Sequence, residues 1–555
     1  MTKRPTFEPT DEQIAFIKAP PRAVLIACPG SGKTETCARR FVLRGTNAPT
    51  RGIAYLSYTN AAVNAARERL QKLGGAALLS PPHFVGTIDA FWQRFLFQPF
   101  IGIVVPGVPI DSIEVFGGGS ADTAPPHISQ GPTYCFYNGT HSGARSWQVR
   151  LRRMNGEFGL YERAANVPLT IEASKACVEK KRQYLCAGFA SHNDVLYWCF
   201  KIIDKCPHAL DILASRFSEI IVDEAQDTSP IQHRLFERLE CCGVDLAFVG
   251  DPDQSIYQFN DAAPTFIRER YASAGKNAFS LTYNFRASRQ IVAAINAFAN
   301  RKMAGVFDAP DPLGAFVTVI PRKDSVDCFR DILERRGIEL ANGALLLRDA
   351  DGVQELVGGP TIDAMNTGVK RLITAMRLDR RGEYAAAADA CSGFLQTVLS
   401  EDASSRPDRD ASRVAAWHFL RKYLPWPDAE AVGDWLNAVK DAVKRFASDR
   451  GLKVGNLSGK ISMRGVPKLS AVEVVGLRAK PSVPVRTVHD AKGESIGAVM
   501  LHGKDRQHKK WLDGKDDEMR CLGYVAMTRA ERLLVIACET EDVAEGWRQL
   551  GFVRL

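Results

Sequence analysis

A glycine-rich loop between an apolar run and an amphipathic stretch constrains the fold of this chain most strongly. The segment "ACPGSGKT" (residues 27–34) follows the strand-like "AVLIA" and precedes the helix-like "TETCARRFVL". This context is typical of a P-loop, in which backbone N–H groups and a helix N-terminus hold phosphate. Gly30 and Gly32 would let the backbone turn inward, Lys33 would reach the β- and γ-phosphates, and the Thr34 hydroxyl would bind Mg²⁺. A glycine turn with a solvated lysine is the alternative, which the flanking context disfavours.

Two adjacent carboxylates follow a second strand-like run, "EIIVDE" (residues 219–224). Its β-branched residues predict a buried strand that ends at Asp223 and Glu224. A P-loop needs a carboxylate at the end of a neighbouring strand to hold Mg²⁺. We therefore expect Asp223 to bind Mg²⁺, directly or through water, and Glu224 to orient and deprotonate an attacking water. A solvated loop start is the alternative for this pair.

Strand-like and helix-like stretches alternate along much of the chain, which indicates βαβ units and parallel sheets. At 555 residues the chain is too long for a single hydrophobic core. We predict an α/β protein with two parallel-sheet core domains, each carrying a mainly helical insertion. The predicted boundaries are residues 1–96 and 214–284 for the first core, 97–213 for its insertion, 285–347 and 481–555 for the second core, and 348–480 for its insertion.

The composition is that of an ordinary globular protein with a mild positive charge. Lysine and arginine number 72 against 63 acidic residues, a net charge of +9 that suits a polyanionic partner without requiring one. The 13 cysteines show no paired metal-binding spacing, which favours a reducing compartment. No secretory signal and no long apolar run is apparent, so we expect a cytoplasmic protein without a membrane partner.

Nine short segments carry a resemblance to one known family. They are "TDEQ", "ACPGSGKT", "YTNAAVNAARERL", "VGTIDAF", "VDEAQDTSPIQ", "VGDPDQSIYQF", "YNFRAS", "TVHDAKGES" and "YVAMTRAERLL". In this order they resemble the UvrD/Rep/PcrA-like DNA helicases of superfamily 1, whose P-loop motif commonly begins with alanine. The resemblance implies two RecA-like core domains. The two insertions carry none of these motifs.

The resemblance implies ATP and Mg²⁺ as cofactors and assigns further nucleotide-binding residues. Gln13 would bond the adenine, Phe285 would stack on it, and Gln226 and Gln254 would sense the γ-phosphate or its attacking water. Arg286 and Arg529 would reach the γ-phosphate from the second core, where a planar guanidinium meets phosphate oxygens well. The other P-loop residues that would line the nucleotide are Ala27, Cys28, Pro29 and Ser31. Oxidation of Cys28 would then inhibit ATP binding, although a small apolar role is the simpler interpretation.

Three aromatic residues match family positions near a single strand of DNA, where base stacking gives sequence-independent binding. These are Tyr58, Tyr257 and Phe259; for Tyr257 and Phe259 a place in the core is the alternative. Residues suited to sugar-phosphate contacts are Thr59, Asn60, Thr87 and His489. Glu494 lies one position earlier than the glutamate that binds the ribose in the family. We assign no specific DNA contact to Asp89. Asp227 is either an anchor for neighbouring residues or a helix cap.

Two functions from different classes fit these residues. The first is an ATP-driven translocase on single-stranded DNA and single–double strand junctions, moving 3′→5′ by family analogy and unwinding duplex. The second is a DNA-sensing ATPase subunit that regulates a partner nuclease, as in anti-phage systems such as Gabija. About 25 residues follow the "TRA" motif, which we expect to be too few for a fused nuclease. The sequence leaves three points open: whether the chain moves on RNA, which pathway it serves (repair, replication or antiviral defence), and its oligomeric state.

Overall fold

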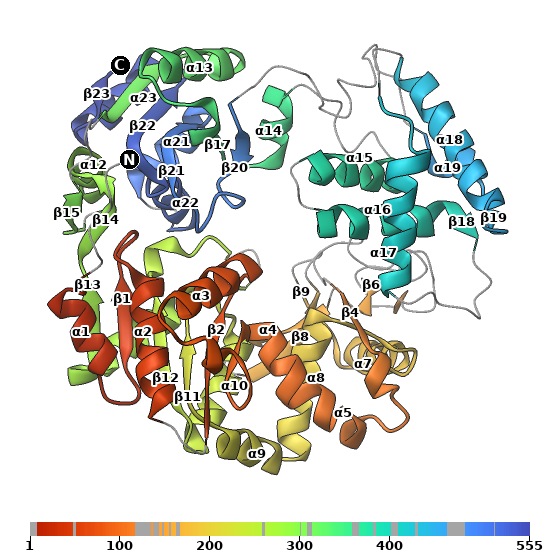
Figure 1. Cartoon of the computed structure of the whole chain (residues 1–555). Helices are drawn as coiled ribbons and strands as arrows, with labels where there is room; N and C mark the ends of the chain where they lie inside the picture. Colours follow the sequence, from red (N-terminus) through yellow and green to blue (C-terminus); the bar gives the residue numbers. More distant parts are fainter. Residues whose placement is uncertain are drawn as a thin grey trace. The chain divides into compact units, whose positions relative to one another are not determined.

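The computed structural model consists of two compact units (Figure 1). The first comprises Met1–Gly119, Pro132–Arg348 and Arg486–Leu555, and the second comprises Ser120–Gly131 and Asp349–Val485. The structure describes residues 8–47, 51–116, 135–136, 144–146, 149–154, 157–162, 167–257, 261–299, 301–307, 313–357, 366–380, 384–400, 409–427, 431–462, 483–514 and 517–555. Among these residues, no helix is both long enough and apolar enough to cross a membrane.

The first unit contains two six-stranded sheets, and the N-terminal one follows the predicted strand–helix alternation. Its strands are β1 (Val24–Ala27), β2 (Gly52–Ser57), β3 (Phe84–Thr87), β11 (Phe217–Val222), β12 (Asp245–Gly250) and β13 (Ala278–Leu281). They lie in the order β13-β1-β12-β11-β2-β3, and all neighbours run parallel. The accompanying helices are α1 (Asp11–Lys18), α2 (Lys33–Thr46), α3 (Asn60–Lys72), α10 (Pro230–Cys241) and α11 (Thr265–Ser273).

This sheet is covered on both faces, which explains its nearly continuous apolar strands. In β11, Ile220 and Val222 pack into one hydrophobic cluster while Ile221 packs into another, as the two-residue period of a strand requires. Only β12 separates β1 from β11 in the sheet, and Figure 1 shows these strands side by side. The loop after β1 and the carboxylates after β11 therefore emerge at the same edge of the sheet.

The second sheet of this unit is built from strands on both sides of the second insertion. They are β16 (Gly314–Val319), β17 (Gly343–Leu347), β20 (Val485–Thr487), β21 (Ile496–His502), β22 (Ala530–Cys538) and β23 (Val553–Arg554), in the order β20-β17-β21-β22-β16-β23. Its helices are α12 (Arg289–Ala299), α13 (Ser325–Arg335), α21 (Asp505–Asp513), α22 (Asp517–Met527) and α23 (Glu541–Gln549). A separate parallel pair, β14 (Tyr283–Ser288) and β15 (Ala304–Phe307), follows the first sheet along the chain. The protein is thus α/β with two RecA-like parallel sheets.

The segment between β3 and β11 is mainly helical but also contains short strands. Its helices are α4 (Ile88–Trp92), α5 (Gln98–Val104), α7 (Ile171–Cys186), α8 (His192–Lys205) and α9 (His208–Arg216), with a π-helical turn at Gln93–Phe97. Its strands are β4 (Glu114–Phe116), β5 (Cys135–Phe136), β6 (Ala144–Arg145), β7 (Val149–Met154), β8 (Glu157–Glu162), β9 (Val167–Pro168) and β10 (Phe189–Ser191). A buried ion pair between Lys181 and Asp194 joins α7 to α8.

The second unit is mainly helical and has its own hydrophobic core. Its helices are α14 (Ala350–Val357), α15 (Thr367–Arg380), α16 (Tyr384–Val398), α17 (Arg409–His418), α18 (Val432–Ser448) and α19 (Leu457–Lys460). A π-helical turn spans Phe419–Tyr423, and β18 (Leu399–Ser400) pairs antiparallel with β19 (Lys453–Val454). On α18, Trp435, Val439 and Val443 recur every four residues and are buried, which is the spacing of one helix face. Domain boundaries finer than the two units stay predictions.

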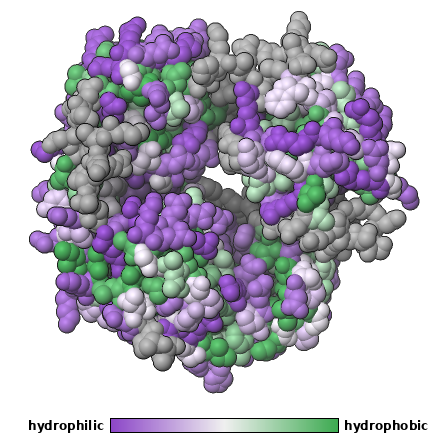
Figure 2. Space-filling model, in the orientation of Figure 1, coloured by the Kyte–Doolittle hydropathy of each residue, from purple (hydrophilic) through white to green (hydrophobic). Residues whose placement is uncertain are grey.

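The face of the molecule drawn in Figure 2 mixes hydrophilic and hydrophobic residues. Such a mixture is ordinary for a folded protein, because polar surface alone cannot cover it.

Candidate nucleotide and nucleic-acid site

The P-loop connects β1 to α2, which begins at Lys33. Gly30 and Gly32 have left-handed φ angles of 70° and 77°, which glycine adopts without strain. A Cβ on Gly30 would also lie 2.6 Å from the Cβ of Arg286. Glycine is therefore needed at position 30 for both conformation and space. The loop leads into the N-terminus of α2, where unpaired N–H groups and the helix dipole favour an anion.

Lys33 lies against the two predicted carboxylates. Its Nζ is 3.3 Å from Asp223 Oδ1 and 2.5 Å from Glu224 Oε1. Burial lowers the pKa of Lys33, but the charges of Asp223 and Glu224 outweigh burial and hold it above the ordinary lysine value. The lysine is therefore a fixed cation at the start of α2, placed where phosphate oxygens would compete with the carboxylates.

Asp223 is positioned as a hard oxygen ligand for a divalent cation. It is buried, its Oδ2 accepts a 2.7 Å hydrogen bond from the Tyr55 hydroxyl, and its backbone N–H donates to Leu56 O. Among the described residues, no cluster of three or more His, Cys, Asp or Glu side chains could hold a metal ion alone. Mg²⁺ typically binds through one or two protein oxygens together with phosphates and water, so Asp223 and the Thr34 hydroxyl fit that donor set.

Glu224 has a left-handed backbone, with φ 56°, which is uncommon outside glycine and often marks functional sites. Its Oε1 faces Lys33 and its Oε2 accepts a 2.6 Å hydrogen bond from Gln226 Nε2. Burial raises the pKa of Glu224, but Lys33 and Lys492 outweigh burial and lower it to about 2. Moving the Lys33 charge to a phosphate would raise the basicity of Glu224, as a general base requires.

The two predicted sensor glutamines are joined through Asp251. Gln226 Oε1 accepts a 3.0 Å hydrogen bond from the Asp251 backbone N–H, and Gln254 Nε2 donates to Asp251 Oδ2 at 2.9 Å. Gln254 Oε1 accepts from Arg529 Nη2 at 3.3 Å. Gln254 therefore connects the first sheet to an arginine of the second. Gln226 is fully buried, so its contact with a phosphate stays a prediction.

The two predicted arginines lie together at the start of β22. Arg286 Nη1 donates to Thr528 O at 3.1 Å, and Arg529 Nη2 donates to the Thr528 hydroxyl at 3.1 Å. Among the described residues, neither has a carboxylate within salt-bridge distance. Burial, followed by the charge of Arg286, lowers the pKa of Arg529 to about 9. Arg529 is buried and Arg286 is partly buried, and the opposing charges of Glu224 and Glu531 reach them without forming a close ion pair. This makes the arginine pair a favourable place for an anion.

The predicted adenine contacts border the P-loop. Gln13 is buried, its Nε2 donates to Ser31 O at 2.8 Å, and its Oε1 accepts from the Thr10 backbone N–H. Phe285 is exposed, while its backbone N–H donates to Gly30 O at 2.9 Å. The structure thus brings Gln13 and Phe285 to the same loop, although part of the Gln13 amide is already bonded to protein.

Three further P-loop residues are held by β13 and β14 or by the sheet core. Cys28 N–H donates to Leu281 O at 3.0 Å, and Asn284 Nδ2 donates to Pro29 O at 2.8 Å. Ala27 is buried in the sheet core. Burial raises the pKa of the Cys28 thiol to about 12. A thiol that stays protonated at neutral pH is a poor target for oxidation, which favours the packing role for Cys28.

The Glu494 side chain bonds to Arg486 and not to the groups that are expected to face the nucleotide. Its carboxylate accepts two hydrogen bonds from the Arg486 guanidinium, at 2.7 and 3.1 Å. Its backbone carbonyl accepts from Arg529 Nη1 at 3.1 Å. The structure therefore relates Glu494 to the arginine pair through its main chain. A ribose contact by the side chain stays a prediction.

The predicted strand-binding aromatics form a cluster between the two sheets. The Tyr58 and Tyr257 rings have centroids 5.1 Å apart, and the His489 ring lies 5.9 Å from Tyr257. His489 comes from the second core, and its Nε2 lies 3.1 Å from Ile256 O. Tyr257 is half-buried, so the structure gives it both a packing contact and an accessible surface. Phe259 lies outside the described residues.

The predicted polar contacts lie at helix starts. Thr59 caps α3, its hydroxyl accepting from Ala62 N at 3.2 Å, and Thr87 caps α4 by accepting from Ala90 N at 3.1 Å. Asn60 is the first residue of α3. Each therefore has a structural role, and its position at a helix N-terminus also suits a phosphate neighbour.

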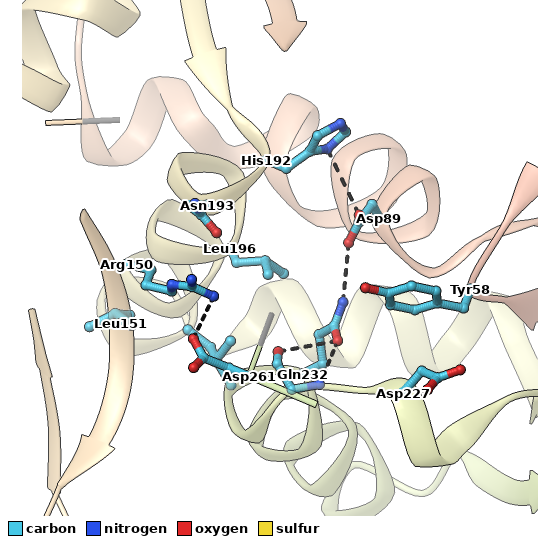
Figure 3. Close-up of a pocket in the computed structure, with 12 residues that line it drawn as sticks. Tyr58, Asp89, Arg150, Leu151, His192, Asn193, Leu196, Asp227, Gln232 and Asp261 are labelled. Carbon is cyan, nitrogen blue, oxygen red and sulfur yellow. Dashed lines mark hydrogen bonds and ion pairs between the residues drawn. The ribbon is translucent and has the colours of Figure 1, made fainter. Parts of the chain in front are cut away.

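A pocket that the sequence did not predict lies beside Tyr58 (Figure 3). Asp89 stands in its wall: Gln232 Nε2 donates to Asp89 Oδ1 at 3.1 Å, and His192 Nδ1 lies 3.9 Å from Asp89 Oδ2. Burial raises the pKa of Asp89. The lining residues are Tyr58, Asp89, Arg150, Leu151, His192, Asn193, Leu196, Asp227, Ser229, Ile231, Gln232 and Asp261. They come from distant segments, which is why sequence spacing gave no signal.

Lys492 is a site residue that sequence reasoning missed, although it lies inside the quoted "TVHDAKGES". Its ammonium forms a close ion pair with Asp227, donates to Gln254 O at 3.0 Å, and lies 4.6 Å from the centre of the Tyr257 ring. Burial raises the pKa of Asp227 to about 6, against the opposing charge of Lys492. Asp227 is thus an anchor for the second core, and Lys492 touches the carboxylate segment and the aromatic cluster together.

The two RecA-like sheets and the P-loop between them define the class of a two-core P-loop protein. Comparison with known proteins gives a match to the UvrD/REP helicase N-terminal domain over residues 10–103 and 145–274. The match covers the first core and part of its insertion, and with the nine ordered motifs it makes the chain similar to the UvrD-like helicases of superfamily 1.

Individual relatives cover only parts of the chain. A putative ATP-dependent DNA helicase, YjcD of Bacillus subtilis, is 34% identical over 418 residues, covering 62% of this chain and 55% of the relative. One subunit of the ATP-dependent helicase/nuclease of Natranaerobius thermophilus is 27% identical over 169 residues, covering 29% of this chain and 13% of the relative. The exonuclease/helicase subunit RexA of Streptococcus pneumoniae is 34% identical over 130 residues, covering 22% of this chain and 10% of the relative. The chain therefore spans about half of YjcD and much less of the other two.

Proposed function

We propose that this chain is an ATP-driven translocase on single-stranded DNA that unwinds duplex DNA in the 3′→5′ direction. One observation carries the proposal. Lys33, Asp223 and Glu224 of the first core lie at the sheet edge that also faces Arg286 and Arg529 of the second core, so a nucleotide bound there would contact both cores. Similarity to the UvrD-like helicases supports ATP and DNA as ligands, and the polarity rests on family analogy alone.

Hydrolysis would use the groups already described. Lys33 and the α2 N-terminus would bind the phosphates, while Thr34 and Asp223 would hold Mg²⁺, which would polarise the phosphoryl oxygens. Glu224 would take a proton from the attacking water as its oxygen bonds to the γ-phosphorus and the bond to the bridging oxygen breaks. Arg286 and Arg529 would stabilise the charge that develops on the transferred group.

Movement would follow from the cross-core contacts of the nucleotide. ATP would be bound by both cores, and phosphate release would weaken the attachment of Arg286 and Arg529, changing the distance between the cores. Tyr58, Tyr257 and His489 would hold the strand by stacking and backbone contacts. Lys492 contacts both Asp227 and Tyr257, which supports coupling between the nucleotide and the strand.

A partial duplex with either a 3′ or a 5′ single-stranded tail tests this proposal. We expect unwinding of the 3′-tailed substrate by the wild type in the presence of ATP and Mg²⁺, and none by Lys33→Ala. Arg548→Ala is the matched control, because Arg548 lies on α23, away from the P-loop, and forms ion pairs with the exposed side chains of Glu541 and Glu545. Unwinding of the 5′-tailed substrate alone would contradict the polarity, and unwinding by Lys33→Ala would contradict the site.

A second function is favoured by the names of two relatives, which describe subunits of a helicase/nuclease and of an exonuclease/helicase. In this alternative the chain is an ATPase subunit that senses DNA and regulates a partner nuclease, for example in antiviral defence or repair. ATP hydrolysis stimulated strongly by single-stranded DNA, without strand separation, would favour it. Co-purification of a nuclease activity would support the same alternative. A cytoplasmic location belongs to both proposals.

A further inference from the structure

Two exposed aromatic side chains, Tyr283 and Phe285, lie next to each other on β14. They are 38% and 40% exposed, and among the described residues of the first unit no other phenylalanine, tyrosine or tryptophan is exposed to this degree. Residues two apart in a strand point to the same face, whereas Asn284 between them is buried. The family resemblance assigns adenine stacking to the Phe285 position, and it gives Tyr283 no role.

The spacing of the two rings suits a flat ligand between them. Their centroids are 6.4 Å apart and their planes differ by 34°. A planar ring in van der Waals contact with an aromatic ring on each face needs about 7 Å between the two, at about 3.5 Å per contact. A small change in the side-chain torsion angles would therefore make Tyr283 and Phe285 the two walls of a slot for an aromatic base.

This slot lies at the rim of the P-loop. The Cys28 thiol donates to Tyr283 O at 3.6 Å, and the Phe285 N–H donates to Gly30 O at 2.9 Å. Helix α1 is fixed to the same strand segment, because Glu12 accepts from the Thr282 N–H at 2.7 Å and from its hydroxyl at 2.6 Å. Gln13, the next residue on α1, bonds Ser31 O of the P-loop. A polar amide and two aromatic rings thus adjoin one end of the phosphate site.

We propose that Tyr283 is a base-binding residue which, together with Phe285, clamps the purine of the nucleoside triphosphate bound by the P-loop. This inference rests on the proposed function, since the ligand is the nucleotide of the same site. A purine overlaps two rings over a larger area than a pyrimidine does, so the clamp favours ATP and GTP over CTP and UTP. Gln13, at the edge of the slot, supplies hydrogen-bonding groups that can read the base.

Removal of the Tyr283 ring tests the clamp by equilibrium binding and by steady-state hydrolysis. We expect Tyr283→Ala to raise the Kd and the KM for ATP about 5- to 30-fold, as the loss of one base–aromatic stack implies. The kcat should stay within about twofold, because Tyr283 touches no reacting group. Tyr283→Phe should bind ATP like the wild type, and the preference for ATP over CTP should shrink in Tyr283→Ala.

Inorganic tripolyphosphate is the discriminating probe, because it has phosphates but no base. We expect its Kd to be the same for the wild type and Tyr283→Ala. Tyr384→Ala is the matched control, since it removes a tyrosine that is 56% exposed on the second unit, and it should leave both Kd values unchanged. An unchanged Kd for ATP in Tyr283→Ala, or equal weakening of ATP and tripolyphosphate, would overturn the clamp.

A failure of the proposed function can be distinguished from a failure of the clamp. A wild-type protein that binds ATP with the predicted sensitivity to Tyr283→Ala, but neither moves on DNA nor unwinds it, would contradict the motor and support the clamp. A wild-type protein that binds tripolyphosphate and not ATP would overturn the clamp itself.

Discussion

Arg529 is a buried cation and Arg286 a partly buried one, and neither forms an ion pair with a carboxylate of the described residues. Arg529 stays protonated at neutral pH, because its pKa is lowered only to about 9. It bonds Gln254 of the first core and two main-chain oxygens of the second. A buried charge without an ion-pair partner costs free energy of folding. We therefore expect Arg529 to stabilise the charge that develops on the transferred phosphoryl group, and not the fold.

Replacing Arg529 should therefore impair catalysis and spare folding. We expect Arg529→Ala to lower the DNA-stimulated kcat by about 10³ to 10⁵, the range known for arginine fingers. Arg529→Lys should restore little, because lysine lacks the planar fork. The melting temperature of Arg529→Ala should not fall. A kcat within tenfold of the wild type, measured beside Arg548→Ala, would contradict the role given to Arg529.

Asp227 gives a pH dependence whose sign follows from its raised pKa. Its pKa is about 6 in the folded protein against an ordinary value of 3.8, so the folded state binds the proton more tightly than the unfolded state. The stability contributed by this proton is complete below about pH 4 and is lost as the pH rises through about 6.

Comparison of the wild type with Asp227→Asn isolates this contribution, because asparagine does not titrate. The free energy of unfolding of the wild type, minus that of Asp227→Asn, should fall by about 1 kcal/mol between pH 5 and pH 7.5, from 1.36 kcal/mol per pKa unit. Urea denaturation at the two pH values measures it. A difference that is constant or rises with pH would show that Lys492 keeps Asp227 ionised throughout.

At the residue scale, the sequence motifs predicted the groups that we expect to contact phosphate, and they did not predict the neighbours that hold these groups in place. Lys33 follows β1 through the P-loop, and Asp223 and Glu224 follow β11 directly, so the parallel strands of one sheet bring all three to the same edge. Tyr55, which bonds Asp223, and Lys492, which bonds Asp227, come from other strands and loops. Nothing in their local sequence marks a tyrosine in a buried strand, or one lysine among many, as a partner.

At the scale of the element, the P-loop depends on Gly30 for its conformation and for its closeness to β14. Alanine at position 30 would be strained at φ 70°, and its Cβ would lie 2.6 Å from the Arg286 Cβ. We expect Gly30→Ala to weaken ATP binding at least tenfold, measured by equilibrium titration, because the loop and β14 must move apart.

Gly74 provides the matched control for this change. It has φ 77°, and no atom lies within 4 Å of the place that a Cβ would take, so alanine there carries the backbone strain alone. Gly74→Ala should cost about 1–2 kcal/mol of stability, because an L-residue is strained in the left-handed conformation, and it should leave the Kd for ATP unchanged. Equal weakening of ATP binding by both substitutions would mean that general strain, not the P-loop geometry, is responsible.

The aromatic cluster of Tyr58, Tyr257 and His489 joins elements of both cores and should carry strand binding. We expect Tyr257→Ala to weaken single-stranded DNA binding about 5- to 100-fold, from about 1–3 kcal/mol per stacked base. Hydrolysis of ATP without DNA should change little, which serves as the internal control. Fluorescence anisotropy with an oligonucleotide measures the loss, and unchanged affinity would place Tyr257 in the core only.

Helices and strands with a clear apolar periodicity were predicted from the sequence, and those without it were not. The strands β1, β2, β11 and β12 are short apolar runs, and α18 shows its buried face in Trp435, Val439 and Val443. The strands β7 and β8 were missed, because "VRLRRM" and "EFGLYE" combine charges with few apolar residues. They are held by antiparallel pairing with each other, from Val149 opposite Glu162 to Met154 opposite Glu157, and apolar periodicity does not reveal such pairing.

At the scale of the whole molecule, the proposed motor depends on contacts between the two cores within the first unit. Arg301 of the second core pairs with Asp251 and Asp253 of the first at 3.0 Å each, and Arg529 reaches Gln254. Sequence motifs predicted that arginines would face the first core, but they did not predict these partners. These partners lie between about 50 and 275 positions apart in the chain, and a single sequence does not show which distant residues pair.

ATP hydrolysis measured together with strand separation on a 3′-tailed partial duplex tests the central claim most directly. The proposed motor predicts hydrolysis that single-stranded DNA stimulates, unwinding that requires ATP, and loss of both activities in Lys33→Ala. Stimulated hydrolysis without unwinding would contradict the motor and favour the regulatory role. Hydrolysis that persists in Lys33→Ala would contradict the nucleotide site on which the motor rests.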